Sequence, residues 1–130
     1  MVVDASSLVD YLVRDGETAL WVRSQLRAAP DLHAPELIDA ETLQAMRGLV
    51  LRGIISSDDA TTAISDLIDA RVVRYPHRPL LDRAWALRGG FTIYDALYVA
   101  LAEALGATLV TTDRRLARAV TTVPVVAPNG

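Results

Sequence analysis

Four acidic residues occupy positions from which their carboxylates can meet. Asp4 and Asp113 each directly follow a short apolar run, and Asp95 lies three residues after Thr92 at the start of a helical stretch. Glu41 lies early in another helical stretch, six residues after a proline. Carboxylates brought together in this way bind hard divalent cations or carry out proton transfer. These residues are therefore the candidates for chemistry.

The apolar periodicity predicts alternating strands and helices. Short strands are expected at 2–4, 32–34, 72–75 and 108–111, and 123–126 is expected to be an edge strand or a frayed tail because it contains Pro124. Helices are expected at 8–12, 17–27, 36–52, 58–70, 79–87, 93–104 and 114–119. No hairpin turn separates the strands, which favours an α/β fold with a parallel sheet covered by helices on both faces.

In a parallel sheet the residues that follow the strands lie at one carboxyl edge, where ligands bind. For each acid alone, a structural role at a helix start is the favoured explanation, and Asp95 with Thr92 fits a capping box. Together, however, such caps place several carboxylates at one edge. Two like charges about 5 Å apart repel by roughly 3 kcal/mol at an effective dielectric of 20. An all-oxygen set without His or Cys suits Mg²⁺ or Mn²⁺.

Composition narrows the classes of function. The chain has 130 residues, 52% of them hydrophobic, which fits a single domain over 1–130. It has no cysteine, and all 13 basic residues are arginine, which excludes disulfides, thiolate sites, Walker-type phosphate loops and Schiff-base lysines. The net charge of −3 argues against a general nucleic-acid coat. Neither a membrane span nor a signal peptide is expected, which favours the cytoplasm.

The whole chain resembles the PIN-domain ribonucleases, particularly the VapC toxins of bacterial toxin–antitoxin pairs. The resemblance rests on VVDASSLVDYL at 2–12, HAPELIDAETLQAM at 33–46, YDALYVALAEALGATLVTTD at 94–113 and the RRLARA that follows. It implies a three-layer α/β/α fold with a central parallel sheet of four to five short strands. It also implies a Mg²⁺- or Mn²⁺-dependent endoribonuclease that leaves a 5′-phosphate and a 3′-hydroxyl.

Matched position by position, the family's four acids fall on Asp4, Glu41, Asp95 and Asp113. The first, third and fourth are expected to hold the metal, while Glu41 orients or deprotonates the attacking water. Ser6 matches a small hydroxyl residue that supports the first acid, and Thr112 is a second such candidate. Arg114 and Arg115 are candidates to bind RNA phosphates, or are simply an exposed basic first turn.

Several residues and functions leave alternatives open. Asp39 is either an accessory ligand or a solvated helix residue, the latter being favoured. Tyr94 and Tyr98 lie four apart and either stack on a base or belong to the core. His33 and His77 allow a metal-free acid–base ribonuclease, which survival of activity in EDTA would favour. The chain has no lysine, which a phosphoacceptor signalling domain would normally need. An inactive PIN-fold binding module remains an alternative.

The resemblance also implies partners. A cognate VapB-type antitoxin would occupy a groove of the toxin, and binding to promoter DNA would occur only through the antitoxin. The apolar helices from Leu8 to Leu26 and from Leu37 to Leu51 suit such a groove or a homodimer interface, although core packing also explains them. Transfer RNA is the substrate that the family suggests. The RNA target, the number of metal ions and the choice of Mg²⁺ or Mn²⁺ stay open.

Overall fold

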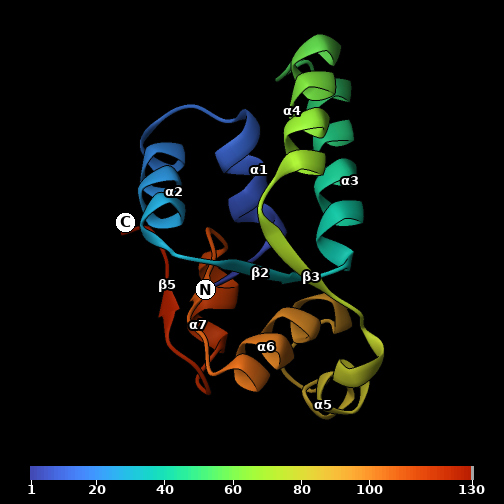
Figure 1. Ribbon diagram of the computed structural model, residues 1–130, viewed down its shortest axis with the longest axis vertical. Coiled ribbons are helices and arrows are strands. Elements are labelled where there is room, and N and C mark those ends of the chain that lie inside the picture. The colour runs from blue at the N-terminus through green and yellow to red at the C-terminus, as the bar shows by residue number, and fades with distance from the viewer. Residues whose placement is uncertain (130) are drawn as a thin grey trace.

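A computed structural model describes residues 1–129 (Figure 1). Within that range the strands are β1 (Val2–Val3), β2 (Leu32–Pro35), β3 (Val72–Tyr75), β4 (Leu109–Val110) and β5 (Val125–Val126). The helices are α1 (Ala5–Val13), α2 (Glu17–Ala28), α3 (Leu37–Leu51), α4 (Ser57–Asp69), α5 (Leu81–Ala86), α6 (Ile93–Leu105) and α7 (Arg114–Ala119), with a 3-10 turn at Arg78–Leu80.

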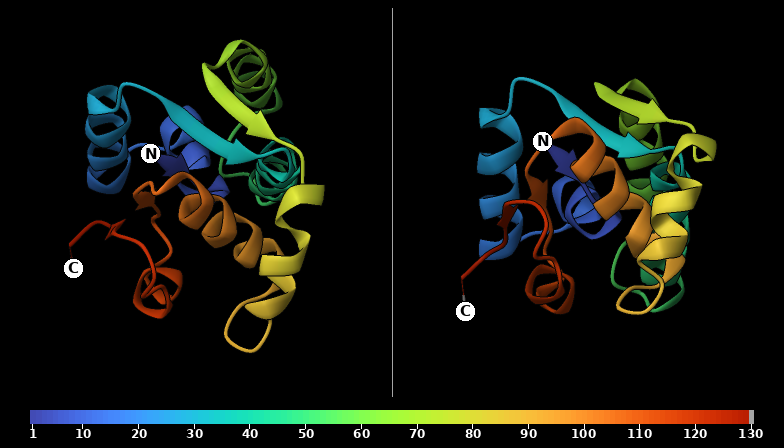
Figure 2. Two further views of the ribbon diagram at one scale, coloured as in Figure 1. Left: turned by 60° about the horizontal axis from the view of Figure 1, so that its bottom comes forward. Right: turned by 90° about the horizontal axis from the view of Figure 1, so that it is seen from below.

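The strands form one sheet in the order β3-β2-β1-β4-β5, and every pairing is parallel. The arrows of β2 and β3 point the same way in Figure 2. The chain moves outward from β1 to β3 and then returns to place β4 on the other side of β1. The order therefore reverses between β1 and β4, and ligands of open parallel sheets bind at the carboxyl ends of strands beside such a reversal.

Helices cover both faces of the sheet. α1, α2, α3 and α4 lie on one side of the β2–β3 ribbon, and α5, α6 and α7 lie on the other (Figure 1). α6 contacts β1, β2 and β4, and its seven consecutive buried residues from Ala96 to Ala102 explain why it is apolar around most of its circumference. The core contains Val2, Val3, Leu8, Ile38, Leu101, Leu109 and Val110, all at most 2% exposed.

The predicted fold class, a three-layer α/β/α arrangement around a parallel sheet, is confirmed. The segment 123–126 is an edge strand rather than a frayed tail, because Val126 pairs with Val110 and the backbone of Pro124 accepts a hydrogen bond from Leu109. The expected helix at 79–87 is instead a 3-10 turn followed by the short α5. Within the described residues, no helix has the length and apolar character needed to cross a bilayer.

Local signals explain why helices start where they do. Ser56 caps α4 and Thr92 caps α6, each accepting a hydrogen bond from the backbone N–H three residues on. Gly106 ends α6 with a φ of 60°, the left-handed conformation that glycine adopts most easily. Asp4 and Asp113 cap α1 and α7, so the capping interpretation is correct for both. Both acids also have other neighbours, because Asp4 accepts hydrogen bonds from the Ser6 and Thr111 hydroxyls and Asp113 interacts with Asp95.

Candidate active site

Asp4 is the buried centre of the candidate site. It follows β1 and is only 5% exposed. Its carboxylate accepts hydrogen bonds from the Ser6 hydroxyl at 2.9 Å, from the Ser7 backbone N–H at 2.9 Å and from the Thr111 hydroxyl. Burial raises the pKa of Asp4 above its ordinary value, while these hydrogen bonds lower it. Three donors therefore orient a carboxylate whose charge is costly to bury.

Glu41 reaches the same region from α3. The phenol of Tyr98, on α6, donates a 2.7 Å hydrogen bond to Oε1 of Glu41. Burial raises the pKa of Glu41, the Tyr98 hydrogen bond lowers it, and the carboxylates of Asp95 and Asp4 raise it further. Glu41 is thus fixed in place by a residue from the opposite face of the sheet and lies within the electrostatic field of two other acids.

Asp95 and Asp113 extend the site along the carboxyl edge. Burial and then the neighbouring charge of Asp113 raise the pKa of Asp95, whereas the Thr92 hydroxyl and the Arg115 guanidinium lower it. The Asp113 side chain accepts hydrogen bonds from the backbone N–H groups of Arg115 and Leu116 at 2.9 and 3.1 Å. Asp4 therefore interacts with Glu41, Glu41 with Asp95, and Asp95 with Asp113. The four acids share the carboxyl edge of the sheet.

The donor set suits a hard divalent cation in chemical type, because it is all oxygen and its members repel one another. Within residues 1–129, however, no three acid or histidine side chains are grouped closely enough to hold one ion in the conformation described. The predicted ligands Asp4, Asp95 and Asp113 lie near one another but do not surround a single point.

The supporting hydroxyls partly match the sequence prediction. Ser6 donates to both carboxylate oxygens of Asp4, at 2.9 and 3.0 Å. The threonine that contacts Asp4 is Thr111, whereas the hydroxyl of Thr112 lies against Asp10. Burial raises the pKa of Asp10, and the Thr112 hydroxyl partly offsets that rise. Thr111 also accepts a 2.9 Å hydrogen bond from the backbone of Asp113, so one side chain links the two strand-end acids. Side chains alternate along a strand, which could have favoured Thr111 over Thr112.

Tyr98 is the other residue whose role the sequence left open. It is 2% exposed, so the base-stacking role is wrong for it, and its contact with Glu41 was not predicted. Tyr94 is 61% exposed and stays a candidate for stacking. The side chains of Arg114 and Arg115 are exposed, and the Arg115 guanidinium lies close enough to Asp95 to interact with its charge.

Asp39 and the two histidines have structural partners. The Asp39 carboxylate forms a bidentate ion pair with Arg74, at 2.9 to 3.1 Å. It is therefore engaged away from the acidic site and is not simply solvated. His33 Nδ1 is hydrogen-bonded to the Tyr75 hydroxyl at 2.8 Å, and His77 Nε2 accepts the N–H of Leu37 at 3.0 Å. Each histidine is bonded to a different partner, which is unlike the paired acid and base of a metal-free ribonuclease.

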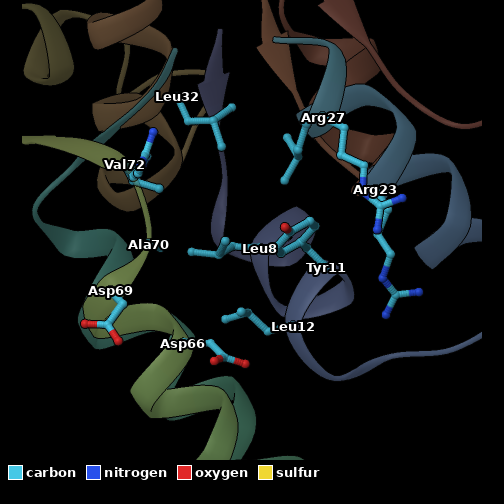
Figure 3. A pocket seen from close by; sticks show the side chains of 12 residues that line it. Leu8, Tyr11, Leu12, Arg23, Arg27, Leu32, Asp66, Asp69, Ala70 and Val72 are labelled. Carbon is cyan, nitrogen blue, oxygen red and sulfur yellow. The ribbon is translucent and has the colours of Figure 1, made fainter. Parts of the chain in front are cut away.

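Two grooves lie apart from the acids. One, of about 530 Å³, has Leu8, Tyr11 and Leu12 of α1 in its middle, between Asp66 and Asp69 of α4 and Arg23 and Arg27 of α2 (Figure 3). Its wall also includes the first residues of β2 and β3, so it lies toward the amino edge of the sheet. The other, of about 560 Å³, is an apolar groove between α3 and α4 that includes Leu43, Leu51 and Ile64.

Comparison with known proteins places this arrangement in a family. Residues 1–121 match the PIN domain. Ribonuclease VapC1 of Mycobacterium tuberculosis is 45% identical over 119 residues, covering 91% of this chain and 89% of that protein. The crystal structure of M. tuberculosis VapC20 superposes with a TM-score of 0.69 at 15% identity, over 95% and 98% of the two chains. VapBC2 from Rickettsia felis, solved with a promoter DNA fragment, gives 0.70 at 12% identity over 98% of each chain.

The chain therefore belongs to the PIN-domain family, with VapC ribonucleases among its relatives.

Proposed function

We propose that this protein is a metal-dependent endoribonuclease and the toxin of a VapBC-type pair. The observation that carries the proposal is the line of mutually repelling carboxylates at the carboxyl ends of β1 and β4. The 45% identity to a protein named as a ribonuclease supports the same activity. Sequence reasoning and the site thus point to hydrolysis of an RNA phosphodiester bond.

The residues have distinct roles in this proposal. Asp4, Asp95 and Asp113 would hold Mg²⁺ or Mn²⁺, with Ser6 and Thr111 orienting Asp4. The bound cation supplies charge neutralisation at the phosphate and makes water more acidic. Glu41, held by Tyr98, orients the attacking water and accepts its proton. Its raised pKa brings it closer to the range of an effective general base.

The partner in this proposal is a VapB-type antitoxin. The Rickettsia VapBC2 structure, named as bound to promoter DNA, supports an assembly that reaches DNA through the antitoxin. The groove between α1, α2 and α4 offers apolar and charged groups to an antitoxin segment (Figure 3). The exposed side chains of α3, including Leu43 and Leu51, are available for a homodimer interface. Transfer RNA in the cytoplasm is the proposed substrate.

The decisive measurement is RNA cleavage by the purified protein with and without Mg²⁺ or Mn²⁺. Asp95→Asn should lower cleavage by at least about a hundredfold, because it removes one of the carboxylates proposed to hold the cation at the reacting phosphate. Asp58→Asn is the matched control, since Asp58 is an exposed acid in the first turn of α4, and it should retain activity. An active Asp95→Asn protein, or activity that survives EDTA, would contradict the metal-dependent site.

Expression in a bacterial host tests the toxin role separately. Induction of the wild type should arrest growth and create new RNA 5′-ends, whereas Asp95→Asn should do neither. Coexpression of the cognate antitoxin should relieve the arrest. Absence of both arrest and new ends with the wild type would favour the alternative of an inactive binding module.

A further inference from the structure

A pocket of about 450 Å³, here called the α1–α3 pocket, lies between those two helices, which contact each other (Figure 1). Along α1 its wall includes Ser6, Asp10 and Arg14, which are four residues apart and therefore share one helix face. The Ser6 hydroxyl is bonded to Asp4 at 2.9 Å, so this wall begins at the acidic site. It ends at Arg14, about 12 Å further along the helix.

The α3 wall of the pocket has the same layout. Gln44, Gly48 and Arg52 line the pocket at intervals of four residues. Glu41 of the acidic site lies three residues before Gln44 and hence on the same helix face. Both walls therefore lead from the candidate active site to an arginine.

Asp10 is a half-buried acid that the proposed hydrolysis does not use. Burial raises its pKa, whereas the Thr112 hydroxyl and the charge of Arg14 lower it. The ion pairs found within residues 1–129 involve neither Asp10 nor the two arginines of the pocket. A carboxylate has about four acceptor positions, so the Thr112 hydroxyl leaves Asp10 able to accept further hydrogen bonds.

The groups of the α1–α3 pocket define the chemistry of its ligand. Arg14 and Arg52 carry the positive charge that binds a phosphate. Asp10 repels a phosphate and instead accepts hydrogen bonds from N–H groups. Leu49 and Ile54 add apolar surface for a ring. Phosphate, N–H donors and a ring occur together in a nucleotide.

The carboxylate of Asp10 selects among the four RNA bases. Guanine presents two adjacent donors on its Watson–Crick edge, the N1–H and the N2 amino group, and the two oxygens of a carboxylate can accept both at once. Adenine and cytosine place a ring-nitrogen acceptor beside their amino group, and uracil has one N–H between two carbonyl oxygens. Each of these would set a lone pair against a carboxylate oxygen, so guanine is the base that fits.

We propose that the α1–α3 pocket binds a guanine next to the cleaved phosphate, with Asp10 accepting from its N1–H and N2 amino group. Arg14 and Arg52 bind the adjoining phosphate of the same nucleotide. The assignment rests on the proposed ribonuclease function and adds a sequence preference to it. Asp10 is thereby a specificity residue, separate from the acids that carry out hydrolysis.

Base analogues in a short RNA test this contact atom by atom. Sequencing the 5′-ends released from a random RNA pool, with Mg²⁺ or Mn²⁺ present, should first show a guanine at one fixed position beside the cleaved bond. At that position kcat/KM is then compared for guanine, inosine and 7-deazaguanine. Inosine lacks the N2 amino group and should be cut at least about fivefold less efficiently, the lower limit for a lost bidentate base contact. 7-Deazaguanine keeps the Watson–Crick edge and should be cut as well as guanine.

Variants of the pocket assign the preference to Asp10. Asp10→Asn replaces one of the two acceptors by a donor, so it should cut the guanine and inosine RNAs with nearly equal efficiency. Asp15→Asn is the matched control, because Asp15 is an exposed acid beside Arg14 that does not line the pocket, and it should keep the preference. Gly48→Leu fills the pocket, since a Cβ at Gly48 meets no atom within 4 Å, and it should also abolish the preference.

Several results would overturn the proposal. These are a random pool cut without a guanine preference, equal cleavage of the guanine and inosine RNAs by the wild type, or an unchanged preference in Asp10→Asn or Gly48→Leu. Poor cleavage of the 7-deazaguanine RNA would show that N7 is read instead, which is the contact of an arginine and not of Asp10. In each of these cases RNA is still cut, so the ribonuclease function stands. If the wild type cuts no RNA with either metal, the ribonuclease function itself fails and the sequence preference fails with it.

Discussion

At the scale of single residues, three of the four acids of the candidate site are restrained by different donors. Thr111 and Ser6 hold Asp4, Tyr98 holds Glu41, and backbone N–H groups of α7 hold Asp113. Carboxylates that repel one another tend to rotate apart unless such donors fix them. The donors therefore hold these carboxylates in place for a positively charged occupant.

Tyr98 provides a direct test of this preorganisation. Tyr98→Phe removes only the hydroxyl that donates to Glu41. A hydrogen bond to a charged group contributes about 1.5 kcal/mol or more, so kcat should fall roughly tenfold. KM should change little, because Tyr98 is buried and cannot touch RNA. Single-turnover and steady-state cleavage assays would separate the two constants.

A control for this variant is Tyr94→Phe on the same helix. Tyr94 is exposed, and no hydrogen bond links its hydroxyl to an acid within residues 1–129. It should keep the wild-type kcat, and its effect, if any, should be on KM. Equal kcat values for Tyr98→Phe and the wild type would show that Glu41 does not depend on the phenol.

The positions of the acids could be predicted from sequence, whereas their donors could not. A strand followed by an acid and then a helix places Asp4 and Asp113 at the same carboxyl edge because their strands are parallel, and the alternation of strands and helices predicted a parallel sheet. The Tyr98 contact, in contrast, joins α3 to α6 across the sheet. Periodicity shows that Tyr98 is on an apolar helix face, but it does not specify which polar atom of another helix its hydroxyl contacts.

At the scale of elements, Arg74 of β3 ties together the end of α4 and the start of α3. Its guanidinium pairs with Asp39 on α3 and also donates to the carbonyls of Leu67 and Val72 at 2.9 and 3.1 Å. The end of a helix leaves carbonyl groups without intrahelical partners, and an arginine can satisfy them. The pairing gives Asp39 a structural role, because it joins the start of α3 to β3.

Two variants separate the ion pair from the carbonyl contacts. Asp39→Asn should cost about 1 kcal/mol or less in free energy of unfolding, because the Asp39 side chain is 44% exposed and solvent screens the pair. Arg74→Met should cost about 2 to 3 kcal/mol, because it also leaves the α4 carbonyls unsatisfied. Urea unfolding measures both. A larger loss for Asp39→Asn than for Arg74→Met would show that the carbonyl contacts contribute little.

Element prediction succeeded where a local signal existed and failed where packing decided. Thr92 marks the start of α6 and Gly106 marks its end, whereas the expected start of α4 at 58 missed the Ser56 cap by one residue. The segment 79–87 is apolar at helical spacing, yet its first turn is a 3-10 turn with a proline near its start. The pairing of Val125 and Val126 with β4 likewise depends on the neighbouring strand and not on their own residue types.

At the scale of the whole molecule, the strand order decides where the charges accumulate. Because β1 and β4 are adjacent and parallel, the acids that cap α1 and α7 face one edge, and α3 and α6 add two more from opposite faces. The fold thereby concentrates repulsion at one place. A site of this kind reduces the stability of the empty protein while it prepares for a cation.

Glu41→Gln tests this trade between stability and function. The folded-state pKa of Glu41 is raised, first by burial and then by Asp95 and Asp4, so the folded protein holds its proton to higher pH than the unfolded chain does. Stability that exists below the unfolded-state pKa is therefore lost as the pH rises through the folded-state pKa. The Gln side chain keeps an oxygen for Tyr98 and carries no charge. At neutral pH in EDTA it should raise Tm by about 1 to 3 °C, a value discounted for partial exposure.

The same variant should lose this advantage in two conditions. At a pH low enough to protonate Glu41, the Tm values of variant and wild type should converge, because neither then carries the charge. Addition of Mg²⁺ should raise the wild-type Tm, and the gap at neutral pH should narrow if the cation relieves the repulsion. Differential scanning calorimetry over pH, with Asp58→Asn as the exposed-acid control, measures both effects. A Glu41→Gln protein that is less stable than the wild type at neutral pH would mean that the carboxylate of Glu41 stabilises the fold, and that repulsion at this edge is too weak to demand a cation.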